Sequence, residues 1–136
     1  MSQALARSLK LLRISLAIGG IYDLILAALL AVAAKPVFAL LALPLPNEPF
    51  YLGLLVVLVA MVAALYLLAA YDPMAYAGNV LVAIGGRFSA GVMMAAMAFG
   101  RDDLTGLYLL AAVDLAFAFV HAACWWPCRH LRAQLF

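Results

Sequence analysis

The segment LLRISLAIGGIYDLILAALLAVAA, residues 11–34, carries Asp23 near the middle of an apolar run. A helix needs about 20 apolar residues to cross a bilayer, so this run is long enough to span one. A carboxylate at that depth is costly to insert, and it normally faces the inside of a helix bundle and has a partner there. The segment therefore predicts a membrane protein with a polar centre.

Small residues share the helical face of Asp23. They lie at spacings of three, four and eight positions from it, and they are Ser15, Gly19, Gly20 and Ala27. Small side chains let neighbouring helices approach closely. We expect this face to contact other helices rather than lipid.

The whole chain has the composition of an integral membrane protein. Of its 136 residues, 71% are hydrophobic and only 10% are charged, and the mean hydropathy is +1.18. We expect a single transmembrane domain over residues 1–136, all-α, folded as a four-helix bundle. The expected spans are residues 11–34, 50–71, 80–100 and 104–126. No length remains for a soluble catalytic domain, so the composition does not favour an enzyme.

Prolines and acidic residues predict where the spans end. Lys35-Pro36 is expected to end the first span, because proline disfavours helix at the preceding residue. Residues 36–43 are too few to span, and we expect a short interfacial helix or turn there, in the first extracytoplasmic loop. Asp72-Pro73 is expected to end the second span. Asp102 or Asp103 is expected to cap the fourth helix.

Basic residues predict the orientation. One side of the bundle is expected to carry Arg7, Lys10, Arg13, Arg129 and Arg132, and the other Lys35 and Arg101. By the positive-inside rule, both termini are expected in the cytoplasm, for a multi-pass protein of the bacterial inner (plasma) membrane. The first run is long for a signal peptide and contains a carboxylate, so it is expected to be retained. No basic patch suggests nucleic acid as a partner.

Arg87 in the third run and Asp114 in the fourth are the expected partners of Asp23. From the helical rise, Asp23 and Asp114 lie about 18 Å from the cytoplasmic start of their spans, and Arg87 about 11 Å. A planar guanidinium can hold one carboxylate and still donate to another. Two interpretations stay open: a structural salt bridge, or a ligand or proton site in which one carboxylate holds a proton. Tyr22, Tyr66 and His121 would extend such a site.

A second cluster lies at the end of the fourth run and comprises His121, Cys124, Cys128 and His130. If the helix continued through Pro127, the first three would share one face. Zinc and copper(I) accept His and Cys ligands, so a metal site is one interpretation. A thiol-redox pair is another, and the third is two structural cysteines beside an interfacial tryptophan belt.

Several motifs together resemble the DoxX-like group of small bacterial four-span proteins. They are the short basic N-terminus, Gly19-Gly20, the proline-rich first loop, Asp72-Pro73, Gly86-Arg87 and Asp114. The resemblance implies a four-helix bundle, often an accessory subunit near membrane redox enzymes or quinone chemistry. It carries over no catalytic residues.

Three functions therefore stay open. The first is a non-enzymatic protein of the lipid bilayer that binds a lipophilic small molecule or serves as an accessory subunit of a membrane complex. The second is a proton-coupled small-molecule transporter working as a homodimer. The third is a membrane metal-binding or thiol-redox protein. The small-residue faces favour a homo-oligomer or a membrane partner, and the sequence identifies no cofactor.

Overall fold

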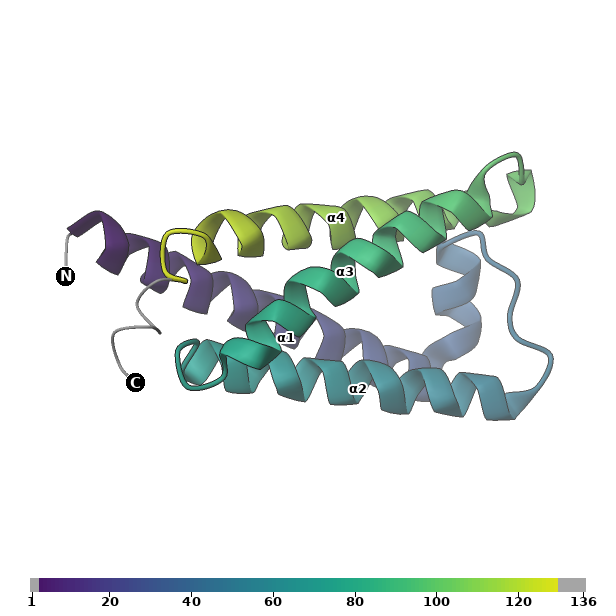
Figure 1. Cartoon of the computed structure of the whole chain (residues 1–136). Helices are drawn as coiled ribbons and strands as arrows, with labels where there is room; N and C mark the ends of the chain where they lie inside the picture. The colour runs from purple at the N-terminus through teal and green to yellow at the C-terminus, as the bar shows by residue number, and fades with distance from the viewer. Residues whose placement is uncertain (1–2, 130–136) are drawn as a thin grey trace.

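The chain is all-α in the computed structural model, which describes residues 3–129 (Figure 1). The helices are α1 (Gln3–Leu40), α2 (Pro49–Tyr71), α3 (Ala77–Ala98), the short 3-10 helix η1 (Asp102–Leu104) and α4 (Gly106–Trp125). The helices α1, α2, α3 and α4 are long and apolar enough to cross a membrane, and no strand occurs among the described residues. The prediction of an all-α chain with four helices long and apolar enough to span a membrane is confirmed.

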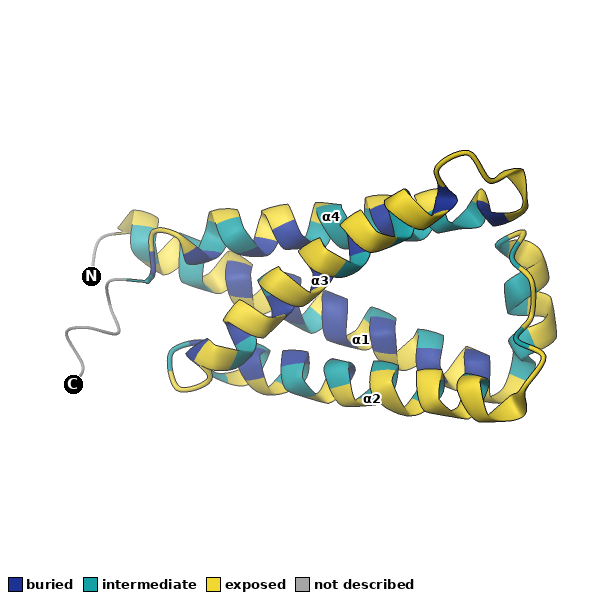
Figure 2. Cartoon of the chain, turned by 45° about the vertical axis from the view of Figure 1, so that its right-hand side comes forward, coloured by how far each residue is buried: buried dark blue, intermediate teal, exposed yellow. Residues whose placement is uncertain are grey.

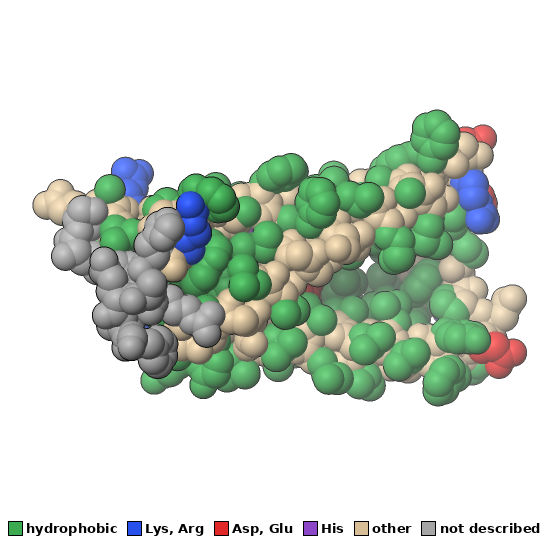
Figure 3. Space-filling view, viewed as in Figure 1, with side chains coloured by type: hydrophobic (Ala, Val, Ile, Leu, Met, Phe, Trp, Pro, Cys, Tyr) green, Lys and Arg blue, Asp and Glu red, His purple; other side chains and the backbone are tan. Residues whose placement is uncertain are grey.

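The four long helices form two close pairs, α1 with α2 and α3 with α4, and α1 also packs against α4. Figure 1 shows α3 beginning beside the end of α2 and then crossing toward α4, so that α2 and α3 diverge. Buried residues lie on the inward faces, and the outward faces are exposed (Figure 2). Large apolar side chains dominate the exposed surface, as they do on a protein that faces lipid (Figure 3).

The interruption predicted at Lys35-Pro36 lies two residues earlier, at Ala33, and a short helical stretch follows it. Helix α1 bends at Ala33, where φ is −142° and ψ is 38°, and continues to Leu40 with Pro36 inside it. Proline lacks an N–H and its ring clashes with the carbonyl four residues earlier, here that of Val32, so a bend near this carbonyl relieves the clash. Figure 1 shows the last part of α1 turned away from the rest of the helix.

The predicted end of the second helix at Asp72-Pro73 is confirmed, because α2 ends at Tyr71. The link after α2 is short, and the Asp72 carboxylate stabilises it by accepting hydrogen bonds from the main-chain N–H groups of Met74 (3.0 Å) and Ala75 (3.1 Å).

The predicted capping of α4 by Asp102 or Asp103 is wrong. Thr105 holds the N-cap position without a side-chain hydrogen bond, and Asp103 instead pairs with Arg101 at 2.7 Å.

The small-residue face of α1 is buried, as expected. Its members Ser15, Gly19, Gly20 and Ala27 all face the interior. A Cβ built on Gly20 would lie 3.1 Å from the main-chain oxygen of Ala63, so this glycine permits the close approach of α1 and α2. Gly91 does the same between α3 and α4, because a Cβ there would lie 2.7 Å from Leu115.

Apolar packing is tightest toward the end of the bundle that holds the start of α1. The buried cluster there comprises Leu12, Leu16, Tyr66, Ala69, Ala77, Val80, Ala83, Trp125 and Cys128. At the same end, Arg13 donates to the main-chain carbonyls of Ala70 (3.1 Å) and Tyr71. These carbonyls belong to the last turn of α2, which has no helical partner for them. The opposite half of the bundle is where α2 and α3 diverge.

Candidate functional site

The three predicted intramembrane charges meet in the bundle interior. Arg87 Nη2 donates to Asp23 Oδ2 at 2.7 Å, and Arg87 Nη1 donates to Asp114 Oδ1. Arg87 Nη2 also donates to the main-chain oxygen of Gly19 at 3.3 Å. The side chains of Arg87, Asp23 and Asp114, called the ionic triad below, are 5%, 8% and 18% exposed. The triad therefore joins α1, α3 and α4 through one guanidinium.

The local sequence explains how each charge reaches the interior. Arg87 lies on the face of α3 that also buries Ala83 and Gly91, four positions before and after it. These small neighbours leave space for the guanidinium. Asp114 is flanked in the same way on α4 by Ala111 and Ala118, which are both buried. Helical spacing and small neighbours together aim the side chains inward.

Aromatic rings surround the guanidinium of Arg87. Its Cζ lies 4.7 Å from the ring centroid of Phe117, 5.0 Å from that of Tyr66 and 5.8 Å from that of Tyr22. These separations fall within the range of about 6 Å in which a ring face attracts a cation. The Tyr66 hydroxyl donates to the main-chain oxygen of Ala83 at 3.4 Å, which links α2 to α3.

Sequence reasoning missed Phe117. It lies three positions after Asp114, so the two share a face of α4. That spacing could have placed Phe117 next to Asp114, because residues three apart on a helix are neighbours. An aromatic residue in an apolar run is too common to single out without the position of Arg87.

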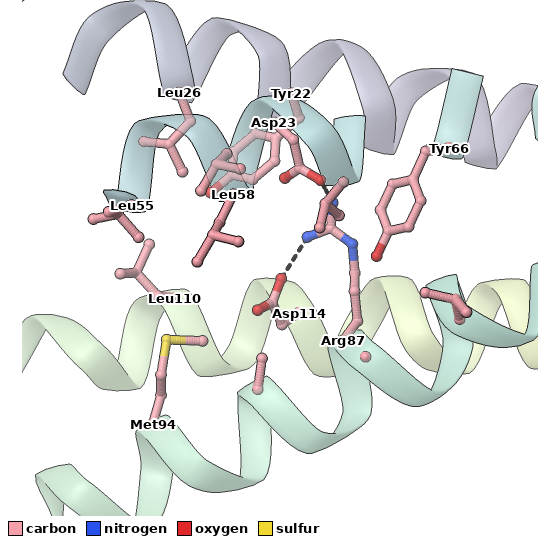
Figure 4. Close-up of a pocket in the computed structure, with 15 residues that line it drawn as sticks. Tyr22, Asp23, Leu26, Leu55, Leu58, Tyr66, Arg87, Met94, Leu110 and Asp114 are labelled. Carbon is pink, nitrogen blue, oxygen red and sulfur yellow. Dashed lines mark hydrogen bonds and ion pairs between the residues drawn. The ribbon is translucent and has the colours of Figure 1, made fainter. Parts of the chain in front are cut away.

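The triad forms one wall of a cavity of about 380 Å³. The other walls are mostly apolar, and the lining residues are Tyr22, Asp23, Leu26, Leu55, Leu58, Val59, Val62, Tyr66, Val82, Gly86, Arg87, Ala90, Met94, Leu110 and Asp114. Figure 4 shows the charged side chains converging on one side and aliphatic side chains on the other. In the space-filling view, the surface is hollowed between α2 and α3 (Figure 3). The cavity thus opens sideways, toward the region that lipid would occupy.

The predicted His and Cys cluster is not assembled as a metal site. Helix α4 ends at Trp125, so Cys128 lies in the following turn, where its N–H donates to the carbonyl of Trp125 at 2.8 Å. The condition for a shared face, a helix continuing through Pro127, is therefore not met. Across residues 3–129, no three His, Cys, Asp or Glu side chains converge in a way that could hold a metal ion. His130 lies outside the described residues.

His121 packs against aromatic rings, and the two cysteines are buried to different degrees. The ring of His121 is fully buried, edge-on to Tyr66 at 6.1 Å and beside Phe117 at 5.7 Å between centroids. Cys128 is fully buried and Cys124 is partly buried, and both are free thiols. Burial raises the pKa of the Cys128 thiol, and the neighbouring Cys124 raises it further. A thiol with a raised pKa is a poor metal ligand and a poor nucleophile at neutral pH, because the thiolate is the reactive form.

Comparisons with models of known protein families, with curated proteins and with solved structures give no match to this chain. The DoxX-like resemblance therefore stays a prediction that rests on its motifs. The chemistry of the cavity and its ionic triad is the basis for a functional proposal.

Proposed function

We propose that this membrane protein binds a small lipophilic molecule in the cavity, with the ionic triad as the polar contact. The observation that carries the proposal is the cavity itself, whose volume of about 380 Å³ combines apolar walls with a single charged wall. Small-molecule sites in proteins are typically about 300–1,000 Å³, mostly apolar, with a few convergent polar groups. The cavity has these properties.

A purely structural salt bridge would need no adjacent space. Protein interiors pack to a density of about 0.74, with few voids larger than a water molecule. The triad instead lies against an open volume, and the Asp114 side chain keeps 18% of its surface exposed there. This exposure favours a role in contacting a ligand. The Asp23 and Arg87 side chains are more deeply buried, and we assign them to holding Asp114 in position.

Tyr22 and Tyr66 complete the polar side of the proposed site. Both line the cavity, and their rings lie beside the guanidinium of Arg87. The Tyr66 hydroxyl is directed to a main-chain oxygen, so this side chain offers its ring to a ligand rather than its hydroxyl. The proposal is therefore one of binding and requires no catalytic step.

A pair of neighbouring glycines on α3 provides the test. Gly86 lines the cavity and Gly85 does not, and a Cβ at either position would meet no atom within 4 Å. Gly86→Leu would place a side chain in the cavity, whereas Gly85→Leu serves as the matched control. Each variant is purified in lipid nanodiscs, and bound small molecules are identified by native mass spectrometry.

The proposal expects a lipophilic molecule to accompany the wild type and Gly85→Leu, and to be lost from Gly86→Leu. Equal retention by all three proteins would place the molecule outside the cavity. A protein that carries no small molecule, even after incubation with a total lipid extract, would contradict the proposal.

We further propose that the protein lies in a bacterial inner membrane with both termini in the cytoplasm, as an accessory subunit or a homo-oligomer. The basic residues support this orientation, because Arg13 and Arg129 lie beside helix ends that share one end of the bundle, and Arg101 lies at the other. Reporter fusions to the two termini test the orientation, and cytoplasmic reporters should be active at both. Activity of a periplasmic reporter at either terminus would contradict it.

A further inference from the structure

We infer that the cavity takes a lipophilic molecule whose head group donates hydrogen bonds, with a protonated amine as the strongest case. This inference rests on the proposed binding function and names the ligand class of that same site. It follows from which hydrogen-bonding positions of the ionic triad are already occupied.

Three of the five N–H donors of Arg87 have acceptors within the protein. Nη2 donates to Asp23 at 2.7 Å and to a main-chain oxygen at 3.3 Å, and Nη1 donates to Asp114. The remaining nitrogen, Nε, has no hydrogen-bond partner but is buried, so its N–H is closed to a ligand in the cavity. Aromatic rings also surround the guanidinium, the nearest centroid being 4.7 Å from Cζ. An anionic head group would therefore find at most one available N–H on the guanidinium, the second hydrogen of Nη1, unless it displaced a carboxylate.

The acceptors of the carboxylates are only half occupied. Within the described residues, Asp23 accepts a hydrogen bond through Oδ2 and Asp114 through Oδ1, and the second oxygen of each has no protein donor. An ionised carboxylate is an acceptor only, with about four lone-pair positions. Figure 4 shows the second oxygen of Asp114 turned away from Arg87. The polar wall of the cavity therefore offers acceptors to a ligand that can donate.

Charge favours a cationic donor over a neutral one. One guanidinium and two carboxylates leave a formal net charge of −1 when all three are ionised. Inside a protein the effective dielectric constant is lower than in bulk water. An unbalanced charge therefore attracts an opposite charge more strongly in the cavity than it would in water. A protonated primary amine supplies a positive charge and three N–H donors, whereas an alcohol supplies one donor and no charge.

The apolar walls define the rest of the ligand. Side chains from α2 and α3, including Leu58, Val62 and Val82, line the cavity beside its opening. An alkyl or ring body would lie along these side chains and would extend between α2 and α3 toward lipid. The site thus fits an amphiphile with a donor head at Asp114 and an apolar body directed outward.

The experiment compares four probes that share one alkyl chain. Radiolabelled decylamine, decanol, decyl methyl ether and decanoate are equilibrated at pH 7 with the protein in phosphatidylcholine nanodiscs, and partition into empty nanodiscs is subtracted. Specific binding is defined as the part that Gly86→Leu removes and Gly85→Leu keeps. Two further variants are Asp114→Asn and, as a matched control on an exposed loop carboxylate, Asp102→Asn.

The inference expects decylamine to bind best, decanol at least tenfold more weakly, and the ether and decanoate weakest. Asp114→Asn should weaken decylamine binding at least tenfold and decanol binding less, while Asp102→Asn should leave both within twofold. Specific binding of decanoate or the ether at least as tight as that of decylamine would overturn the inference and leave the proposed function standing. Absence of specific binding by all four probes would overturn both.

The ranking of the probes on the wild-type protein does not depend on any variant. If Asp114→Asn fails to fold, as judged by circular dichroism, the comparison of decylamine with decanoate on the wild type still decides the inference. A preference for decanoate there would contradict it.

Discussion

Replacing Arg87 by Met tests the energetic role of the ionic triad most sharply. The substitution keeps an unbranched side chain but removes the guanidinium, which is 5% exposed and paired with both Asp23 and Asp114. Two carboxylates then remain beside each other without a partner. Breaking a buried ion pair by removing one partner typically costs about 3–5 kcal/mol. We expect a loss of unfolding free energy in this range, because the carboxylates are only 8% and 18% exposed.

The measurement is detergent-induced unfolding of the purified protein in mixed micelles, followed by circular dichroism. The matched control is Arg101→Met, which removes a guanidinium that is 56% exposed and paired with a loop carboxylate. Exposed pairs contribute little, so the control should unfold as the wild type does. In the Arg87→Met background, changing Asp23 and Asp114 to Asn should restore about 0.5–3 kcal/mol, the range for coupled neighbours.

Two results would refute this reasoning. The first is an Arg87→Met protein that unfolds at the wild-type detergent concentration, which would mean that the triad contributes nothing to stability. The second is a failure of the Asn substitutions to restore any stability, which would mean that the loss comes from packing and not from the unpaired carboxylates.

Three further predictions concern other parts of the fold. Gly106→Ala should lower the unfolding midpoint in the same assay, because its Cβ would clash with the main-chain oxygen of Leu41. A wild-type midpoint would show that this close approach is absent. Cys128 should resist iodoacetamide at pH 8 in the folded protein and react fully in SDS, because burial raises the pKa of its thiol. Mass spectrometry of the labelled peptide measures the modification, and equal modification in both states would contradict the prediction. Pro36→Ala should relieve the bend of α1 and lengthen the distance between spin labels placed on either side of it, and an unchanged distance would show that Pro36 does not cause the bend.

The charged centre was predictable from sequence because its signals are local. Each of Asp23, Arg87 and Asp114 lies deep within an apolar run. The helical rise places Arg87 about 7 Å from the depth of the two carboxylates, a difference that its long side chain can bridge. The cost of an unpaired charge in a membrane then requires the side chains to meet. The small residues around Asp23 gave the orientation of α1 by the same logic.

The cavity was not predictable, because it depends on how helices diverge. Gly91 brings α3 close to α4 at Leu115, and Gly20 brings α1 close to α2, so the two pairs separate along the line between α2 and α3. The pattern of apolar residues along a single helix does not predict how far that helix lies from its neighbours. The break in α1 was predictable, because Pro36 disfavours helix before it, but its position at Ala33 and the direction of the helical stretch that follows were not.

A crystal structure of the protein grown from a lipid mesophase with decylamine tests the central claim most directly. We predict an amphiphile in the cavity, with its amine within hydrogen-bond distance of Asp114 and its alkyl chain directed between α2 and α3. A closed, dry interior in which Arg87 bridges both carboxylates and α2 packs against α3 would contradict the claim, and the triad would then be purely structural.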